Sequence, residues 1–134
     1  MALTGVLRAG FVQLRVFGMD EALAHYVDYI GLELVEKADD GRAYLRGYDE
    51  FNRHSIVLRE ADLPGVDVMA FKVVGDADLD AFEKRIENFG LAVDHVATGE
   101  QPSVGRRIGF TLPSGHRIEL YAEIARSNNG PIIE

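Results

Sequence analysis

The stretch Pro113-Ser114-Gly115-His116-Arg117-Ile118-Glu119-Leu120-Tyr121 decides how the rest of the chain is interpreted. Its Pro-Ser-Gly start is typical of a tight turn, and the alternation of apolar and polar residues after it predicts a β-strand. In such a strand alternate side chains share a face, which sets Ile118, Leu120 and Ala122 against Arg117, Glu119 and Tyr121. The stretch therefore predicts a closing strand with one core face and one face that carries a carboxylate.

The composition is that of a single globular domain. The chain has 134 residues, of which 47% are hydrophobic and 27% charged, and it has no cysteine. That length can bury a core, while the missing thiols exclude disulfides, thiolate metal sites and Cys nucleophiles. No apolar run reaches the roughly 20 residues of a membrane span, and Met1–Gly5 lacks the features of a signal peptide, so we expect a cytoplasmic protein with no membrane partner.

The charge excludes one class of partner. The formal net charge is −8, and the basic residues are dispersed among acidic ones. Nucleic-acid phosphates are bound by clustered Lys and Arg, so we expect no nucleic-acid partner.

The same order of elements occurs twice along the chain. After a short lead at 1–10, residues 9–60 predict a strand, a helix with Asp20 as N-cap, and three strands, at 11–16, 21–30, 32–37, 42–48 and 54–60. Residues 66–124 repeat this order, with Asp76 or Asp78 as the helix cap, at 66–74, about 76–89, 91–97, 106–112 and 116–124. Four pairs of stretches match between the halves: Leu14–Gly18 with Phe71–Gly75, Gly31–Leu34 with Gly90–Val93, Gly41-Arg42 with Gly105-Arg106, and His54–Leu58 with His116–Leu120.

The repeat predicts the fold class. We expect an α+β domain over 1–124, in which two tandem βαβββ units, 9–60 and 66–124, form a curved mixed sheet. A concave sheet face is a natural site for a small molecule, yet a fold does not fix a function. The pattern alone leaves a binding domain and a duplicated domain without a site equally open.

Several stretches carry a family resemblance, and they extend over about residues 5–124: Phe11–Val16, Ala22–Val27, Ile30–Leu32, Gly41–Leu45, Val57–Asp62, Gly105–Arg107 and Pro113–Ala122. They resemble the amino-terminal domain of the catechol 2,3-dioxygenase (extradiol dioxygenase) family, in the vicinal oxygen chelate or glyoxalase–bleomycin resistance superfamily. The resemblance implies a longer protein with a second, carboxy-terminal domain that holds Fe(II) on two His and one Glu and opens a catechol ring beside its two hydroxyls. Residues 125–134 are then the start of an interdomain linker or a tail.

The resemblance also implies where metal ligands would stand. The two His positions correspond to Phe11 and Val68, the carboxylate to Glu119, and the active-site Tyr to Gly109. A 2-His-1-carboxylate site needs three ligands on one face of the iron, so a single carboxylate does not suffice. We therefore expect no catalytic residue, no cofactor in this chain, and no activity of the chain alone, with Glu119 as the single ligand-type match.

The remaining candidate residues have simpler interpretations. We expect the four histidines to be structural or solvated rather than metal ligands: His25, His54, His95 and His116. We expect three aromatic residues on middle strands to fill the core or the concave face: Tyr44, Tyr48 and Phe110.

Three functions from different classes remain open at this level. The first is the non-catalytic domain of an extradiol dioxygenase, which packs on the carboxy-terminal catalytic domain and supports a homo-oligomer. The second is a free-standing glyoxalase-like metalloenzyme with a site at a dimer interface, although Phe11, Val57 and Val68 stand where it needs ligands. The third is a metal-free binding module of the bleomycin-resistance kind. A domain without its partner exposes apolar surface, so we expect dimers or larger assemblies.

Overall fold

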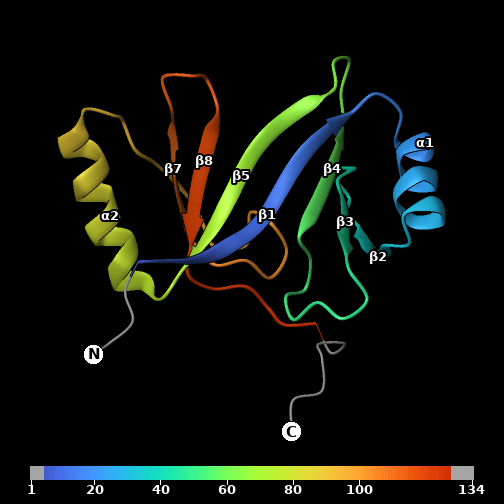
Figure 1. Cartoon of the computed structure of the whole chain (residues 1–134), viewed down its shortest axis with the longest axis horizontal. Helices are drawn as coiled ribbons and strands as arrows, with labels where there is room; N and C mark the ends of the chain where they lie inside the picture. Colours follow the sequence, from blue (N-terminus) through green and yellow to red (C-terminus); the bar gives the residue numbers. More distant parts are fainter. Residues whose placement is uncertain (1–4, 128–134) are drawn as a thin grey trace, which may run out of the picture. The chain divides into compact units, whose positions relative to one another are not determined.

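The structure is a computed structural model, and it describes residues 5–127. The chain forms two compact units (Figure 1). Among the described residues, one unit contains residues 5–10 together with Val68–Ile124, and the other contains Phe11–Asp67 together with residues 125–127. Among residues 5–127, no helix has the length and apolar content needed to cross a membrane.

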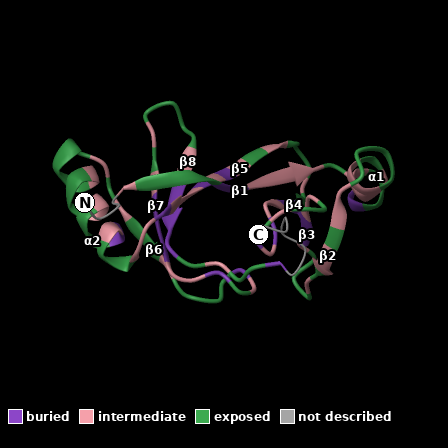
Figure 2. Cartoon of the chain, turned by 60° about the horizontal axis from the view of Figure 1, so that its bottom comes forward, coloured by how far each residue is buried: buried purple, intermediate pink, exposed green. Residues whose placement is uncertain are grey.

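The unit that carries the second repeat is built from five elements in the order βαβββ: β5 (Gly65–Val73), α2 (Asp76–Phe89), β6 (Asp94–Val96), β7 (Arg107–Thr111) and β8 (Arg117–Tyr121). Its strands lie in the order β5-β8-β7-β6. Strand β5 pairs with β8 in parallel, and the other pairs are antiparallel. Helix α2 packs on β7 and β8, over a core of Val73, Leu79, Ile108, Leu120 and Ala122 (Figures 1 and 2).

The unit that carries the first repeat has the same order of elements, with its helix in two parts: β1 (Val6–Val16), α1 (Met19–Leu23), the π-helix η1 (Ala24–Tyr29), β2 (Glu33–Lys37), β3 (Ala43–Arg46) and β4 (Ile56–Glu60). Its strands lie in the order β2-β3-β4-β1, with β1 parallel to β4. Met19, Ala43, Leu45 and Leu58 form its core. The expected α+β class and the tandem βαβββ arrangement are confirmed.

The strand faces follow the predicted alternation. Leu120 and Ala122 are buried in the α2 core and Ile118 packs against it, while Glu119 and Tyr121 are buried on the opposite side of β8. Figure 2 shows that buried residues concentrate on β7 and β8 in this unit.

The lead predicted at residues 1–10 is wrong for Val6–Gly10, which is the first part of β1. The carbonyl oxygen of Gly5 accepts a hydrogen bond from the amide of Val74, 3.3 Å away, at the end of β5. Most of these residues are exposed, so buried and exposed residues do not alternate along this part of the strand. The sequence therefore has no period-two pattern here from which a strand could be predicted. They group with Val68–Ile124, although the expected first unit, 9–60, includes Ala9 and Gly10.

Neither α1 nor α2 has an aspartate at its N-cap position, although the Asp78 side chain takes part in the capping of α2. The N-cap of α1 is Gly18, and the amide of Met19 donates to the Glu60 side chain at 3.0 Å, so a residue distant in sequence does the capping. The N-cap of α2 is Gly75. Its amide donates a hydrogen bond at 3.1 Å to the side chain of Asp78, which lies in the first turn of the helix. The predicted stop at Gly90 is confirmed, because this residue has φ 108°, a left-handed conformation that glycine adopts without strain.

The middle strands are shorter than predicted. Strand β3 ends at Arg46, so Tyr48 lies in the following loop and is 74% exposed rather than buried. After β8, Ala125 and Ser127 hydrogen bond to Arg53 and Phe51 through the backbone, so the described start of the expected linker packs on the first repeat.

We predict that Leu79→Ala destabilises the chain by about 2–5 kcal/mol, because it removes a fully buried side chain from beneath α2. The matched change Leu63→Ala, at a side chain that is 75% exposed, should stay within about 0.5 kcal/mol. Chemical denaturation measures both. Equal losses for the two variants would contradict the assigned core.

Candidate functional site

The carboxylate of Glu119 lies at the centre of a buried charged cluster. Glu119 sits in the middle of β8 and is 5% exposed. Its Oε1 accepts a hydrogen bond from Arg107 Nε at 2.7 Å, and its Oε2 accepts one from Arg117 Nε at 2.9 Å. Both oxygens of the single ligand-type residue are therefore held by guanidinium groups.

The two arginines connect Glu119 to further carboxylates. Arg107 is 3% exposed and also pairs with Glu100. Arg117 makes a two-pronged contact with Asp94, with both nitrogen–oxygen distances 2.8 Å. This guanidinium holds the pKa of Asp94 below its usual range, and the two carboxylates raise the pKa of Arg117. The five residues form a continuous ion network on the face of β6, β7 and β8 opposite α2.

Gly109 makes room for this network. It pairs with Glu119 on β8 and with Asp94 on β6. A Cβ at this position would lie 2.1 Å from Arg117 Nη2. The position to which the resemblance assigns the active-site Tyr is therefore filled by the Arg117 guanidinium, which spans from Asp94 to Glu119.

The two positions that correspond to the metal-binding histidines are apolar and buried. Phe11 on β1 is 4% exposed, and its ring meets His54 edge-on with centroids 6.2 Å apart. Val68 on β5 is 6% exposed. Within residues 5–127, no group of three or more His, Asp or Glu side chains is placed to hold a metal ion. Iron of the 2-His-1-carboxylate type does not fit these residues.

His54 lies in the core of the first repeat. It is fully buried, and its ring lies 4.7 Å from that of Tyr44. Arg53 Nη1 lies 3.1 Å from His54 Nδ1, and because a guanidinium only donates, Nδ1 is the acceptor in the neutral ring. Val57, on the adjoining strand β4, is also fully buried. His54 and Tyr44 are thus both fully buried and in contact with each other.

The other histidines are separate from one another and exposed. His25 meets Tyr26 edge-on, His95 pairs with Glu83 at 2.9 Å, and His116 lies 2.8 Å from Ser114 Oγ. Phe110 packs against the α2 core, as predicted.

The sequence reading identified Glu119 but missed its partners Arg107, Arg117 and Asp94. One signal could have found Arg107: alternation on β7 places Arg107 and Gly109 on the face opposite Ile108, the face that Glu119 shares on the neighbouring strand. The pairing with Asp94 depends on the register of β6 against β7, which the sequence pattern does not give.

We predict that Gly109→Ala displaces the Arg117 guanidinium and raises the pKa of Asp94 toward its ordinary value. A lowered carboxyl pKa stabilises the fold above the ordinary pKa, and this contribution is lost as the pH falls through the folded value. The variant should therefore lose stability at neutral pH and little in acid. NMR titration of Asp94 measures the shift.

Gly75→Ala is the control, because a Cβ there meets nothing within 4 Å. It should leave the Asp94 titration unchanged. An unchanged titration in Gly109→Ala as well would show that Arg117 does not depend on the space at residue 109.

Comparisons with known proteins agree with this architecture. Residues 66–125 match the family model described as the catechol 2,3-dioxygenase-like N-terminal domain. The metapyrocatechase of Pseudomonas sp. (strain CF600) is 44% identical over 119 residues, which cover 89% of this chain and 39% of that protein. A manganese-dependent 2,3-dihydroxybiphenyl 1,2-dioxygenase of Geobacillus genomosp. 3 is 24% identical over 121 residues, which cover 90% of this chain and 38% of that protein.

Solved structures give the same result. The 2,3-dioxygenase LapB from Pseudomonas sp. KL28 superposes with a TM-score of 0.90 at 38% identity, over 99% of this chain and 46% of that one. Homoprotocatechuate 2,3-dioxygenase from Brevibacterium fuscum gives a TM-score of 0.86 at 25% identity, over 94% and 35%. The chain thus spans about two fifths of the length of the curated relatives it matches. In sequence and in fold, the chain is similar to part of these dioxygenases, and residues 66–125 resemble a catechol 2,3-dioxygenase-like N-terminal domain.

Proposed function

We propose that the chain is the non-catalytic amino-terminal domain of an extradiol ring-cleaving catechol 2,3-dioxygenase that acts in the degradation of aromatic compounds in the cytoplasm. The observation that carries the proposal is the state of Glu119, whose two oxygens are occupied by Arg107 and Arg117. The similarity to the amino-terminal parts of dioxygenases supports it.

In this proposal the metal belongs to the carboxy-terminal domain of the whole protein, where Fe(II) would support ring opening. One relative is named as manganese-dependent, and the assignment of Fe(II) rather than manganese is therefore part of the proposal. No step of that chemistry is assigned to residues of this chain, because their donors do not fit the metal.

The role of this domain is to pack on the catalytic domain and to support a homo-oligomer. Large apolar side chains exposed on the first repeat support such contacts. Phe17 is 75% and Tyr29 84% exposed. Exposed aromatic residues of this kind are enriched where proteins meet.

A free-standing glyoxalase-like metalloenzyme needs donors at positions where this chain is apolar. Phe11, Val57 and Val68 are at most 6% exposed, and none of these apolar side chains carries a donor atom for a metal. A site shared with a second copy would therefore have to take its ligands from other residues.

We predict that the chain restores catechol cleavage when it is co-expressed with the carboxy-terminal domain of the strain CF600 metapyrocatechase. The two domains should co-purify, and the complex should form the yellow ring-cleavage product, while neither part alone does so at a comparable rate. Absorbance of the product and size-exclusion chromatography measure both.

Glu119→Gln in the same complex distinguishes a structural role of this carboxylate from a role in turnover. Because Gln keeps the shape but not the charge, a structural carboxylate predicts a less stable domain whose complex still turns over when it is folded. Loss of turnover in a folded complex, or two domains that never associate, would contradict the proposal.

A further inference from the structure

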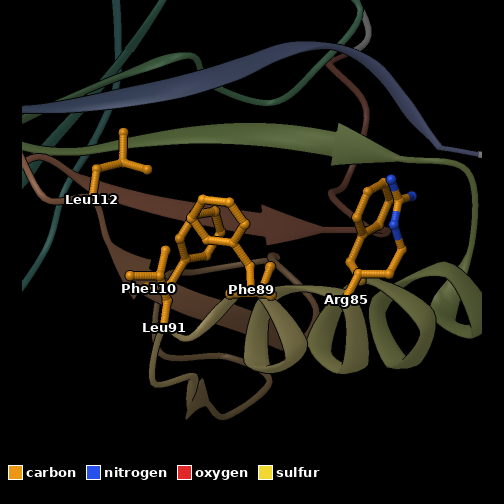
Figure 3. Close-up of a pocket in the computed structure, with 7 residues that line it drawn as sticks. Arg85, Phe89, Leu91, Phe110 and Leu112 are labelled. Atoms are coloured by element: carbon orange, nitrogen blue, oxygen red, sulfur yellow. The ribbon is translucent and has the colours of Figure 1, made fainter.

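The second repeat contains a solvent-open pocket of about 300 Å³ on the α2 side of its sheet, away from the Glu119 network (Figure 3). Six apolar side chains line it: Phe82, Ile86, Phe89, Leu91, Phe110 and Leu112. The only charged group in the lining is Arg85. This is the usual make-up of a small-molecule site, which is mostly apolar with few polar groups that set orientation.

The pocket exists because the apolar face of α2 extends past the part of the sheet that covers it. Leu79, Phe82, Ile86 and Phe89 follow one another at helical spacing. Leu79 is fully buried, whereas Phe89 in the last turn is 78% exposed. The chain then turns at Gly90, and the amide of Leu91 donates to the carbonyl of Ile86 at 3.2 Å. Leu91 thereby joins the lining of the pocket beside Phe110 on β7 (Figure 3).

The position of the Arg85 guanidinium favours binding of an anion. Its guanidinium lies 5.3 Å from the centre of the Phe82 ring. Stacking of this kind fixes the plane of the guanidinium while its N–H groups point outward in a fork that matches a carboxylate. Within residues 5–127 no acidic side chain pairs with Arg85, although the chain as a whole carries a net charge of −8.

The pocket is apolar along most of its length and has a cationic group at one end. In Figure 3, Arg85 stands at one end of the row of side chains and Leu112 at the other, with Phe89, Phe110 and Leu91 between them. A ligand that uses the whole row must be apolar along its length and anionic at one end. A cation would meet Arg85 unfavourably, and a neutral apolar ligand would leave its N–H groups unused.

We propose that this pocket binds a small amphipathic carboxylate, with an aromatic or aliphatic body between Phe89 and Phe110 and its carboxylate on Arg85. This site is separate from the ring-cleavage chemistry, and it does not depend on the proposed function. Binding would also cover the apolar side chain of Phe89.

The test is an NMR titration of the chain with 1-naphthoate and with the neutral 1-naphthamide, followed on backbone amides. We expect saturable shifts for 1-naphthoate, confined to residues 82–91 and 110–112. Arg85→Gln should weaken 1-naphthoate binding by about three- to tenfold, because it removes one charge-assisted contact, and should leave 1-naphthamide binding unchanged.

Lys84→Gln is the matched control, since it removes the same charge from the neighbouring residue of α2, which does not line the pocket. It should leave both affinities unchanged. Equal binding of the acid and the amide, equal effects of the two substitutions, or shifts outside the pocket would overturn the proposal. So would concentration-dependent pocket shifts without ligand, because these would show that a second copy covers the site.

Discussion

The structure of the second repeat depends on two guanidinium groups that share one buried carboxylate. Glu119, Arg107 and Arg117 lie on neighbouring strands, and the first two are almost fully buried. Burying a charge is costly unless it is paired and hydrogen bonded, so removal of any one member leaves the remaining charges with fewer partners. A metal ion at Glu119 would have to displace both arginines, and residues 5–127 offer no group of three His, Asp or Glu side chains that could hold it. The network thus occupies the oxygens that a metal would need.

The two repeats fill equivalent positions with different chemistry. Glu119 of β8 corresponds to Val57 of β4, which is fully buried and apolar. His116 is exposed beside Ser114, whereas its equivalent His54 is fully buried against Tyr44. One βαβββ unit thus tolerates an ion network and the other an aromatic core at the same place in the topology. The fold supplies the positions, and the residues at them decide whether a site exists.

Local patterns in the sequence predicted most of the fold, and contacts distant in sequence account for what they missed. Alternation on β8 and the helical spacing from Leu79 to Phe89 were sufficient to define the core faces. The capping of α1 by Glu60 was not visible, because it joins residues 41 positions apart. At the site, Glu119 could be singled out, but its pairing with Arg107 depends on strand register. The sequence therefore identified the carboxylate, and the structure was needed to show that both of its oxygens accept hydrogen bonds from arginines.

The measurement that tests this account most directly is the metal content of the chain after anaerobic loading with Fe(II) and desalting. The account predicts far less than one iron per chain, with no change in Glu119→Gln, because both carboxylate oxygens are already bound by Arg107 and Arg117. One iron per chain that is lost in Glu119→Gln would contradict it. That result would mean that the arginines give way to the metal and that ligands outside the described network complete the site.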